Sequence, residues 1–99
     1  MNDDLCKIIA LRLVDEVVGF VNVEVGERYD KEAQEKVPVF IINIKREGIH
    51  WHRWYKTDYI YDHFNSGKTV DELVDEILWK YKGYLIDKVV TKKFFKKTA

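Results

Sequence analysis

Residues 69–81 most strongly constrain the fold of this chain, because a complete helix-start signal is followed there by an unbroken apolar stripe. Thr69 and Glu72 have the T-x-x-E spacing of a capping box, in which each side chain can satisfy a free backbone amide. Apolar residues then recur every three or four positions, namely Val70, Leu73, Val74, Ile77, Leu78 and Tyr81. This spacing predicts an amphipathic helix that packs on a core, with Gly83 closing it.

A second helix is predicted over residues 3–18. Leu, Ile and Val follow helical spacing in this segment, interrupted only by Arg12, and Gly19 marks the expected end. Residues 7–14 alone are also compatible with a β-strand, so this alternative stays open.

The remaining C-terminal segments are less uniform. Thr57 and Asp58 can cap a short helix that runs to about Asn65 and stops at Ser66-Gly67. Residues 84–95 fit either a further helix or, in part, a strand. Residues 96–99 are expected to fray.

Three strands are predicted between the helices. Residues 20–25 alternate between apolar and polar side chains, residues 37–44 form the most hydrophobic run, and residues 49–55 form an aromatic strand after a turn at 46–48. The polar segment 26–36 is interpreted as an exposed loop or short helical turn. The economical arrangement is a three-stranded antiparallel sheet.

Pro38 gives a further constraint on this sheet. Because it has no amide proton, it is expected at the first rung of its strand or on an edge. An exposed edge beside Pro38 could pair between two copies of the chain, which makes a homo-oligomer one expectation.

The composition indicates one globular domain. The 99 residues are 46% hydrophobic and 14% aromatic, enough to fill a single core. The expected fold is α+β: an N-terminal helix, a three-stranded antiparallel sheet, and C-terminal helices packed on one face of the sheet. A single cysteine, an acidic start and the lack of a long apolar run favour a cytoplasmic protein without a membrane span.

The net charge of zero conceals four blocks of alternating sign. Residues 1–36 carry nine acids and five bases, and residues 37–56 carry one acid and four bases. Residues 57–87 carry seven acids and three bases, and residues 88–99 carry five lysines and no acid. Such alternation indicates surfaces of opposite sign and argues against a uniformly basic nucleic-acid-binding protein.

Catalytic and metal-binding patterns are weak. His50 and His52 would lie on the same face of a strand, as metal ligands often do, yet further ligands would have to come from His63, Cys6 or distant carboxylates. Cys6 lies among apolar residues, where a thiol is normally a small buried hydrophobe. The carboxylates spaced four apart on the predicted helices fit a solvated face. We therefore expect a protein that is not an enzyme and has no metal or cofactor.

The strongest candidate for function is a binding surface on residues 45–56. This predicted hairpin interleaves cationic and aromatic side chains, with the candidate residues Arg46, His50, Trp51, His52, Arg53, Trp54 and Tyr55. Such residues are typical of protein interfaces, which predicts a protein-binding module, for example an inhibitor or adaptor encoded by a mobile element. Alternatively, the hairpin and the lysine tail 88–97 could bind single-stranded nucleic acid. Strand alternation could instead bury one aromatic face under the helices.

One part of the chain resembles a known family. Tyrosines, a glycine junction and an amphipathic helix follow one another at Tyr59, Tyr61, Phe64, Gly67, Thr69, Val70, Ile77, Leu78 and Tyr81. This pattern is similar to that of an uncharacterised bacterial domain family, although residues 55–58 lack the proline that many of its members have there. The resemblance implies the order helix, strands, two helices, and it implies no catalytic residue.

Overall fold

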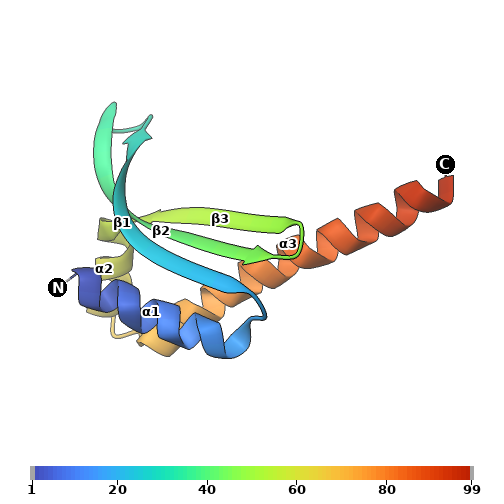
Figure 1. Ribbon diagram of the computed structural model, residues 1–99. Helices are drawn as coiled ribbons and strands as arrows, with labels where there is room; N and C mark the ends of the chain where they lie inside the picture. Colours follow the sequence, from blue (N-terminus) through green and yellow to red (C-terminus); the bar gives the residue numbers. More distant parts are fainter. Residues whose placement is uncertain (1, 99) are drawn as a thin grey trace.

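The computed structural model describes the backbone of residues 2–98 and the side chains of residues 2–88. Along the chain it contains α1 (Asn2–Glu16), β1 (Phe20–Asp30), β2 (Glu35–Arg46), β3 (Ile49–Lys56), α2 (Thr57–Asn65) and α3 (Val70–Thr98). Figure 1 shows the three helices on one side of a twisted sheet, with α3 extending well beyond the sheet. The predicted α+β fold is confirmed.

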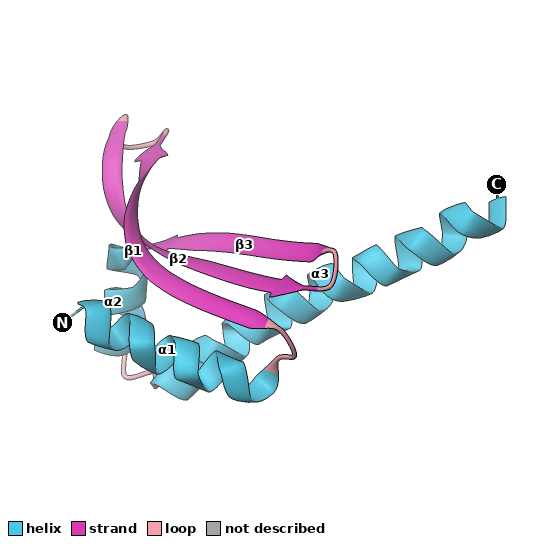
Figure 2. Ribbon diagram, in the orientation of Figure 1, coloured by secondary structure: helices cyan, strands magenta, loops and turns pink. Residues whose placement is uncertain are grey.

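The sheet is antiparallel with the order β1-β2-β3. Figure 2 shows that its strands form one layer and that no helix lies on the opposite side. Successive strand residues point to opposite faces, and the cross-strand rows on the helix-facing side are apolar except for Arg53 at their margin. They are Val21–Ile44–Trp51, Val23–Ile42–Arg53 and Val25–Phe40–Tyr55.

The core lies between these rows and the helices. α1 contacts β1 and α3, while α2 contacts β2 and β3. The fully buried side chains include Ile9 and Leu13 of α1, Ile60 of α2, and Leu73 and Ile77 of α3. Each of these residues belongs to an apolar stripe with helical spacing, which is why the three helices turn those sides towards the sheet.

The N-terminal prediction is confirmed, with small differences at the ends. Residues 2–16 form a helix, so the alternative of a strand over residues 7–14 is wrong. Gly19 has a φ of 140°, a backbone conformation that favours glycine, and the position of its missing Cβ lies 2.3 Å from the carbonyl oxygen of Lys45. The glycine therefore lets the chain pass close to β2 as it enters β1.

The prediction of a loop over residues 26–36 is wrong. β1 continues to Asp30 and β2 begins at Glu35, so most of this polar segment is a two-stranded extension of the sheet. We call residues 26–38 the hairpin arm; it curls away from the helices in Figure 1. Polar side chains are tolerated there because cross-strand hydrogen bonding satisfies the backbone while both faces remain largely in solvent. β3 pairs only as far as Val39, so Pro38 lies where β2 is an edge strand, as predicted.

The C-terminal helices differ from the prediction in two ways. α2 begins after Lys56 and has no side-chain cap, so the predicted capping by Thr57 and Asp58 is wrong. The predicted end of α2 at Ser66-Gly67 is correct, because the helix ends at Asn65 and Gly67 has a φ of 91°. Gly83 does not close α3, which continues to Thr98. A glycine weakens a helix interior by only about 1 kcal/mol, which the surrounding residues offset.

The segment 84–95 is helical, in agreement with one of the two alternatives. The backbone of residues 96–98, which we expected to fray, is also helical, and Ala99 lies outside the described residues. Within the described part of the chain, no helix is both long enough and apolar enough to cross a membrane.

Candidate functional site

Strand alternation divides the seven predicted binding residues between the two faces of the sheet. Trp51 and Tyr55 point towards the helices and expose only 6% and 7% of their surface. The Trp51 ring meets the Tyr81 ring of α3 edge to face, with centroids 5.6 Å apart. These two predicted residues therefore belong to the core, which uses their apolar area, and they are not at the surface of the sheet.

Three of the other predicted residues lie on the side of the sheet away from the helices, which we call the open face. His50 and His52 are exposed there, and Trp54 is half-buried. The cross-strand register completes this face with four rows: Phe20–Lys45–His50, Asn22–Asn43–His52, Glu24–Ile41–Trp54 and Gly26–Val39–Lys56. Phe20 is 62% exposed at one corner of the face.

The two histidines of the open face are neighbours. Their ring centroids lie 6.5 Å apart, and Nε2 of His50 lies 2.9 Å from Oδ1 of Asn43. The third predicted histidine, His63, is in α2, where its Nε2 lies 3.0 Å from the carbonyl oxygen of Thr69. Among residues 2–88, no group of three or more histidine, cysteine or acidic side chains is placed to hold a metal ion.

Below Trp54 the open face has a small apolar cluster of its own. Val39 and Ile41 are buried, although they point away from the main core. Gly26 explains the close approach of β1 to this cluster, since a Cβ at that position would lie 2.7 Å from Cδ1 of Ile41. Ile41 is the cross-strand partner of Trp54, so this aliphatic cluster adjoins the half-buried indole on the open face.

An ion pair closes the end of the open face. The carboxylate of Asp30, near the tip of the hairpin arm, lies 2.5 Å from the ammonium of Lys56 at the end of β3. The hydrogen bond from Lys56 lowers the pKa of Asp30 and raises the pKa of Lys56. The arm is thereby held in its curled position. A groove of about 390 Å³ runs beside this pair and is lined in part by Val37, Pro38 and Asp58.

Arg53 lies on the helix-facing side, at the margin of the core. Its guanidinium lies 5.5 Å from the centre of the Tyr55 ring, which in turn stacks on Tyr59 at 5.5 Å. The Tyr59 hydroxyl donates to both carboxylate oxygens of Glu76, at 2.8 and 2.9 Å. This row links β3, α2 and α3. The Arg53 side chain is exposed and lies along the margin of the helix-facing side, over the Tyr55 ring.

Burial changes the acidity of one member of this row. Loss of solvent around the phenol raises the pKa of Tyr55 to about 12, because the ionised form would be poorly solvated. Arg53 opposes this effect by favouring the phenolate. Tyr55 is therefore neutral over the physiological range, which fits a core role.

Arg46 is also on the helix-facing side, at the β2–β3 turn. It is exposed, and it lines a shallow depression together with Lys45, Glu47 and Gly48. Gly48 has a φ of 71°, as the tight turn requires. Arg46 therefore lies at the turn end of the sheet, next to the open face. Its side chain is on the helix-facing side.

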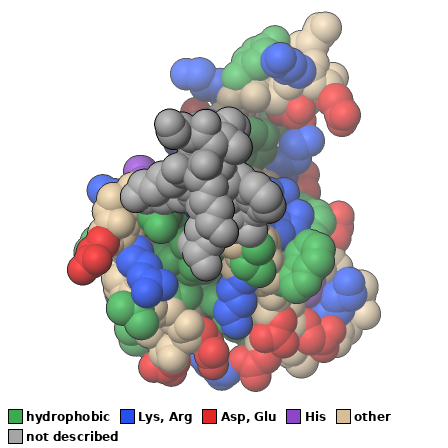
Figure 3. Space-filling view, turned by 90° about the vertical axis from the view of Figure 1, so that its right-hand side faces the viewer, with side chains coloured by type: hydrophobic (Ala, Val, Ile, Leu, Met, Phe, Trp, Pro, Cys, Tyr) green, Lys and Arg blue, Asp and Glu red, His purple; other side chains and the backbone are tan. Residues whose placement is uncertain are grey.

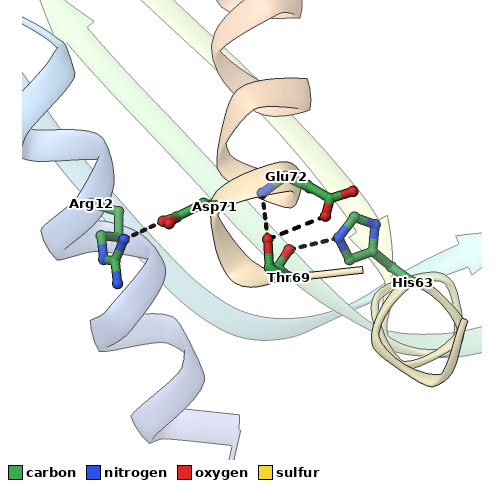
Figure 4. A network of polar contacts seen from close by, with 5 residues as sticks. All are labelled: Arg12, His63, Thr69, Asp71 and Glu72. Atoms are coloured by element: carbon green, nitrogen blue, oxygen red, sulfur yellow. Dashed lines mark hydrogen bonds and ion pairs between the residues drawn. The ribbon is translucent and has the colours of Figure 1, made fainter. Parts of the chain in front are cut away.

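A polar network joins α1, α2 and the start of α3 on the helix-facing side of the sheet. Figure 4 shows Arg12 of α1 paired with Asp71 of α3, and Thr69 bonded to Glu72 and His63. The Thr69 hydroxyl accepts a hydrogen bond from the Glu72 amide at 3.2 Å, which confirms one half of the capping box. The Glu72 carboxylate accepts from the Thr69 hydroxyl at 3.4 Å, and not from the Thr69 amide as predicted. These contacts fix helix positions and present no reactive group.

The lysine tail is only partly described. Lys88 lies with its ammonium 5.5 Å from the centre of the Tyr84 ring, and the side chains of residues 89–97 lie outside the described residues. Figure 3 looks along α3 from its C-terminal end and shows basic and acidic side chains mixed around it, with acidic ones along the lower margin. The visible surface is therefore not a field of one sign.

Sequence reasoning missed the residues that β1 and β2 contribute to the open face. They are Phe20, Asn22 and Asn43. The alternation of residues 20–25 already places Phe20 and Asn22 on one side of a strand, but the register that sets them beside His50 and His52 is a tertiary property. Comparison of the chain with models of protein families, with curated proteins and with solved structures gives no match.

Proposed function

We propose that this protein is a non-enzymatic binding module whose open face contacts another protein. The observation that carries the proposal is the uncovered side of the sheet. There Phe20, His52 and Trp54 are presented by strands whose other side is anchored in the core. Rigid aromatic side chains lose little conformational entropy on binding and are typical of interface hot spots.

The charges favour a protein over a nucleic acid as the partner. The open face carries the acid Glu24 as well as Lys45, which lie in different cross-strand rows. Lys56 is paired with Asp30. The two arginines of the predicted patch, Arg46 and Arg53, belong to the other face. Binding of single-stranded nucleic acid relies on a continuous positive groove beside the stacking rings, and the open face offers isolated cations.

The test compares variants that separate the two faces. We expect His52→Ala with Trp54→Ala to abolish capture of the partner from a cell extract, while the protein remains folded. Leu11→Ala is the matched control, because Leu11 is 68% exposed on α1, away from the sheet. It should capture the same partner as the unaltered protein.

Two results would contradict the proposal. Capture that survives the loss of both His52 and Trp54, or that Leu11→Ala weakens as strongly, would move the contact elsewhere. Binding of single-stranded oligonucleotides that falls steeply as salt rises, and that needs Trp54, would instead support the nucleic-acid alternative.

A further inference from the structure

The outer side of α3 carries an exposed apolar stripe that the proposed function does not use. Trp79 and Ile86, seven positions apart, expose 77% and 62% of their surface. Gly83 lies between them, and apart from the helix's own backbone around it no atom of the described residues lies within 4 Å of the position its Cβ would occupy. Leu78 and Tyr81, on the inner side of the same helix, belong to the core. The stripe therefore faces away from the sheet.

The same helix changes charge along its length. Its first two turns carry Asp71, Glu72, Asp75 and Glu76, whereas the segment 88–97 contains five lysines and no acid. Glu72 and Asp75 precede Trp79 by seven and four positions, so they lie on the same side of the helix as the stripe. Both are exposed.

We infer that two copies of this chain pair through α3, with the helices antiparallel and crossing near Gly83. This arrangement sets Trp79 of one copy against Ile86 of the other, twice, as a twofold axis requires. Gly83 has no side chain at the crossing, so the two helices can approach closely. The acidic end of each helix then lies beside the lysine-rich end of its partner.

The length and position of α3 suit this pairing. It has 29 residues, a length of about 43 Å, and Figure 1 shows its C-terminal half standing clear of the sheet. A second copy can therefore lie along it without meeting the body of the first. An anionic membrane surface fits the stripe less well, since Glu72 and Asp75 would face it.

The pairing makes a prediction that a single helix on a membrane does not. In the full chain, the double variant Glu72→Lys with Asp75→Lys should be monomeric, and so should Lys92→Glu with Lys93→Glu. An equimolar mixture of the two variants should form a heterodimer. In this heterodimer, each N-terminal end of α3 again lies beside a C-terminal end of opposite charge. Far-ultraviolet circular dichroism of each variant checks that the helices are intact.

Sedimentation equilibrium over a dilution series is the measurement. The unaltered chain should show a monomer–dimer equilibrium, and Trp79→Ala should raise its Kd by roughly 1,000-fold, because the twofold dimer loses two hot-spot aromatic residues, each worth roughly 30-fold. A monomer at every concentration, a dimer that Trp79→Ala leaves unchanged, or a mixture that stays monomeric would each overturn the inference. So would monomeric protein that binds phosphatidylserine vesicles through Trp79. None of these outcomes bears on the open face.

Discussion

The carboxylate of Asp30 lies 2.5 Å from the ammonium of Lys56, although these residues belong to the tip of the hairpin arm and the end of β3. Asp30 pairs in the sheet with Glu35, and Lys56 with Val39. The ion pair therefore spans several rungs, which is geometrically feasible because the arm curls over the open face. It defines one wall of the proposed binding surface.

Acid should release the arm. Because Lys56 lowers the pKa of Asp30 below its ordinary 3.8, the stabilising contribution is present above that value and is lost as the pH falls through the lowered pKa. Hydrogen exchange of the arm amides should accelerate in that range. Asp30→Asn should show the faster exchange already at neutral pH, and Glu32→Gln, at an exposed neighbouring position, should not.

The two tryptophans of β3 should respond differently to truncation. Trp51→Ala should lower the free energy of unfolding by about 3–5 kcal/mol, since it opens a cavity beside Tyr81. Trp54→Ala should cost about 1–2 kcal/mol, because the indole is only half-buried. Urea denaturation measures both. Equal losses would show that Trp54 is as much a core residue as Trp51.

Alkaline titration should show a late phenolate step from Tyr55, one of the six tyrosines. Its pKa is raised to about 12 from 10.0, so the unfolded state ionises at a lower pH than the folded state. The free energy of unfolding is therefore highest below pH 10 and falls as the pH rises through 12. A phenolate absorbance step near that pH should be missing in Tyr55→Phe. If the variant keeps the late step, burial of this phenol is not its cause.

The same Tyr55→Phe substitution should leave stability unchanged or slightly increased. The Tyr55 hydroxyl is buried and has no hydrogen-bond partner among the described residues. Removing it therefore relieves a desolvation cost without breaking a bond. Thermal unfolding measures the change, and a large drop in Tm would reveal a partner for this hydroxyl.

Loss of the α3 cap should be measurable as well. Thr69→Ala removes the acceptor of the Glu72 amide and should lower the free energy of unfolding by about 1 kcal/mol. Thr69→Ser keeps a hydroxyl and should stay close to the unaltered protein. A loss as large in the serine variant would assign the effect to packing of the threonine methyl group.

Local signals in the sequence were sufficient for most of the architecture. The capping pair Thr69 and Glu72 and the stripe after it predicted the start of α3, and the alternation around residues 20–25 and 49–55 predicted two strands. These patterns work because burial of one face dominates the energetics of each element. They failed at Gly83, where continuous packing and helix cooperativity outweigh the weak local preference of one glycine.

The hairpin arm and the binding surface could be predicted only in part. Residues 26–36 have the composition of a loop, and only pairing with the partner strand makes them a hairpin. The candidate patch was drawn along the chain, whereas strand alternation assigns Trp51 to the core and His52 to the open face. Phe20 joins the surface through cross-strand register, which a linear reading of residues 45–56 does not contain.

Site-directed crosslinking tests the central claim most directly. A photoreactive amino acid placed at position 52 lies on the open face, and the same residue at position 11 lies on the outer side of α1. In the native cell, we predict one dominant protein adduct from position 52 and none from position 11. The same adduct from position 11, or no protein adduct from position 52, would contradict the proposal that the open face is the partner-binding surface.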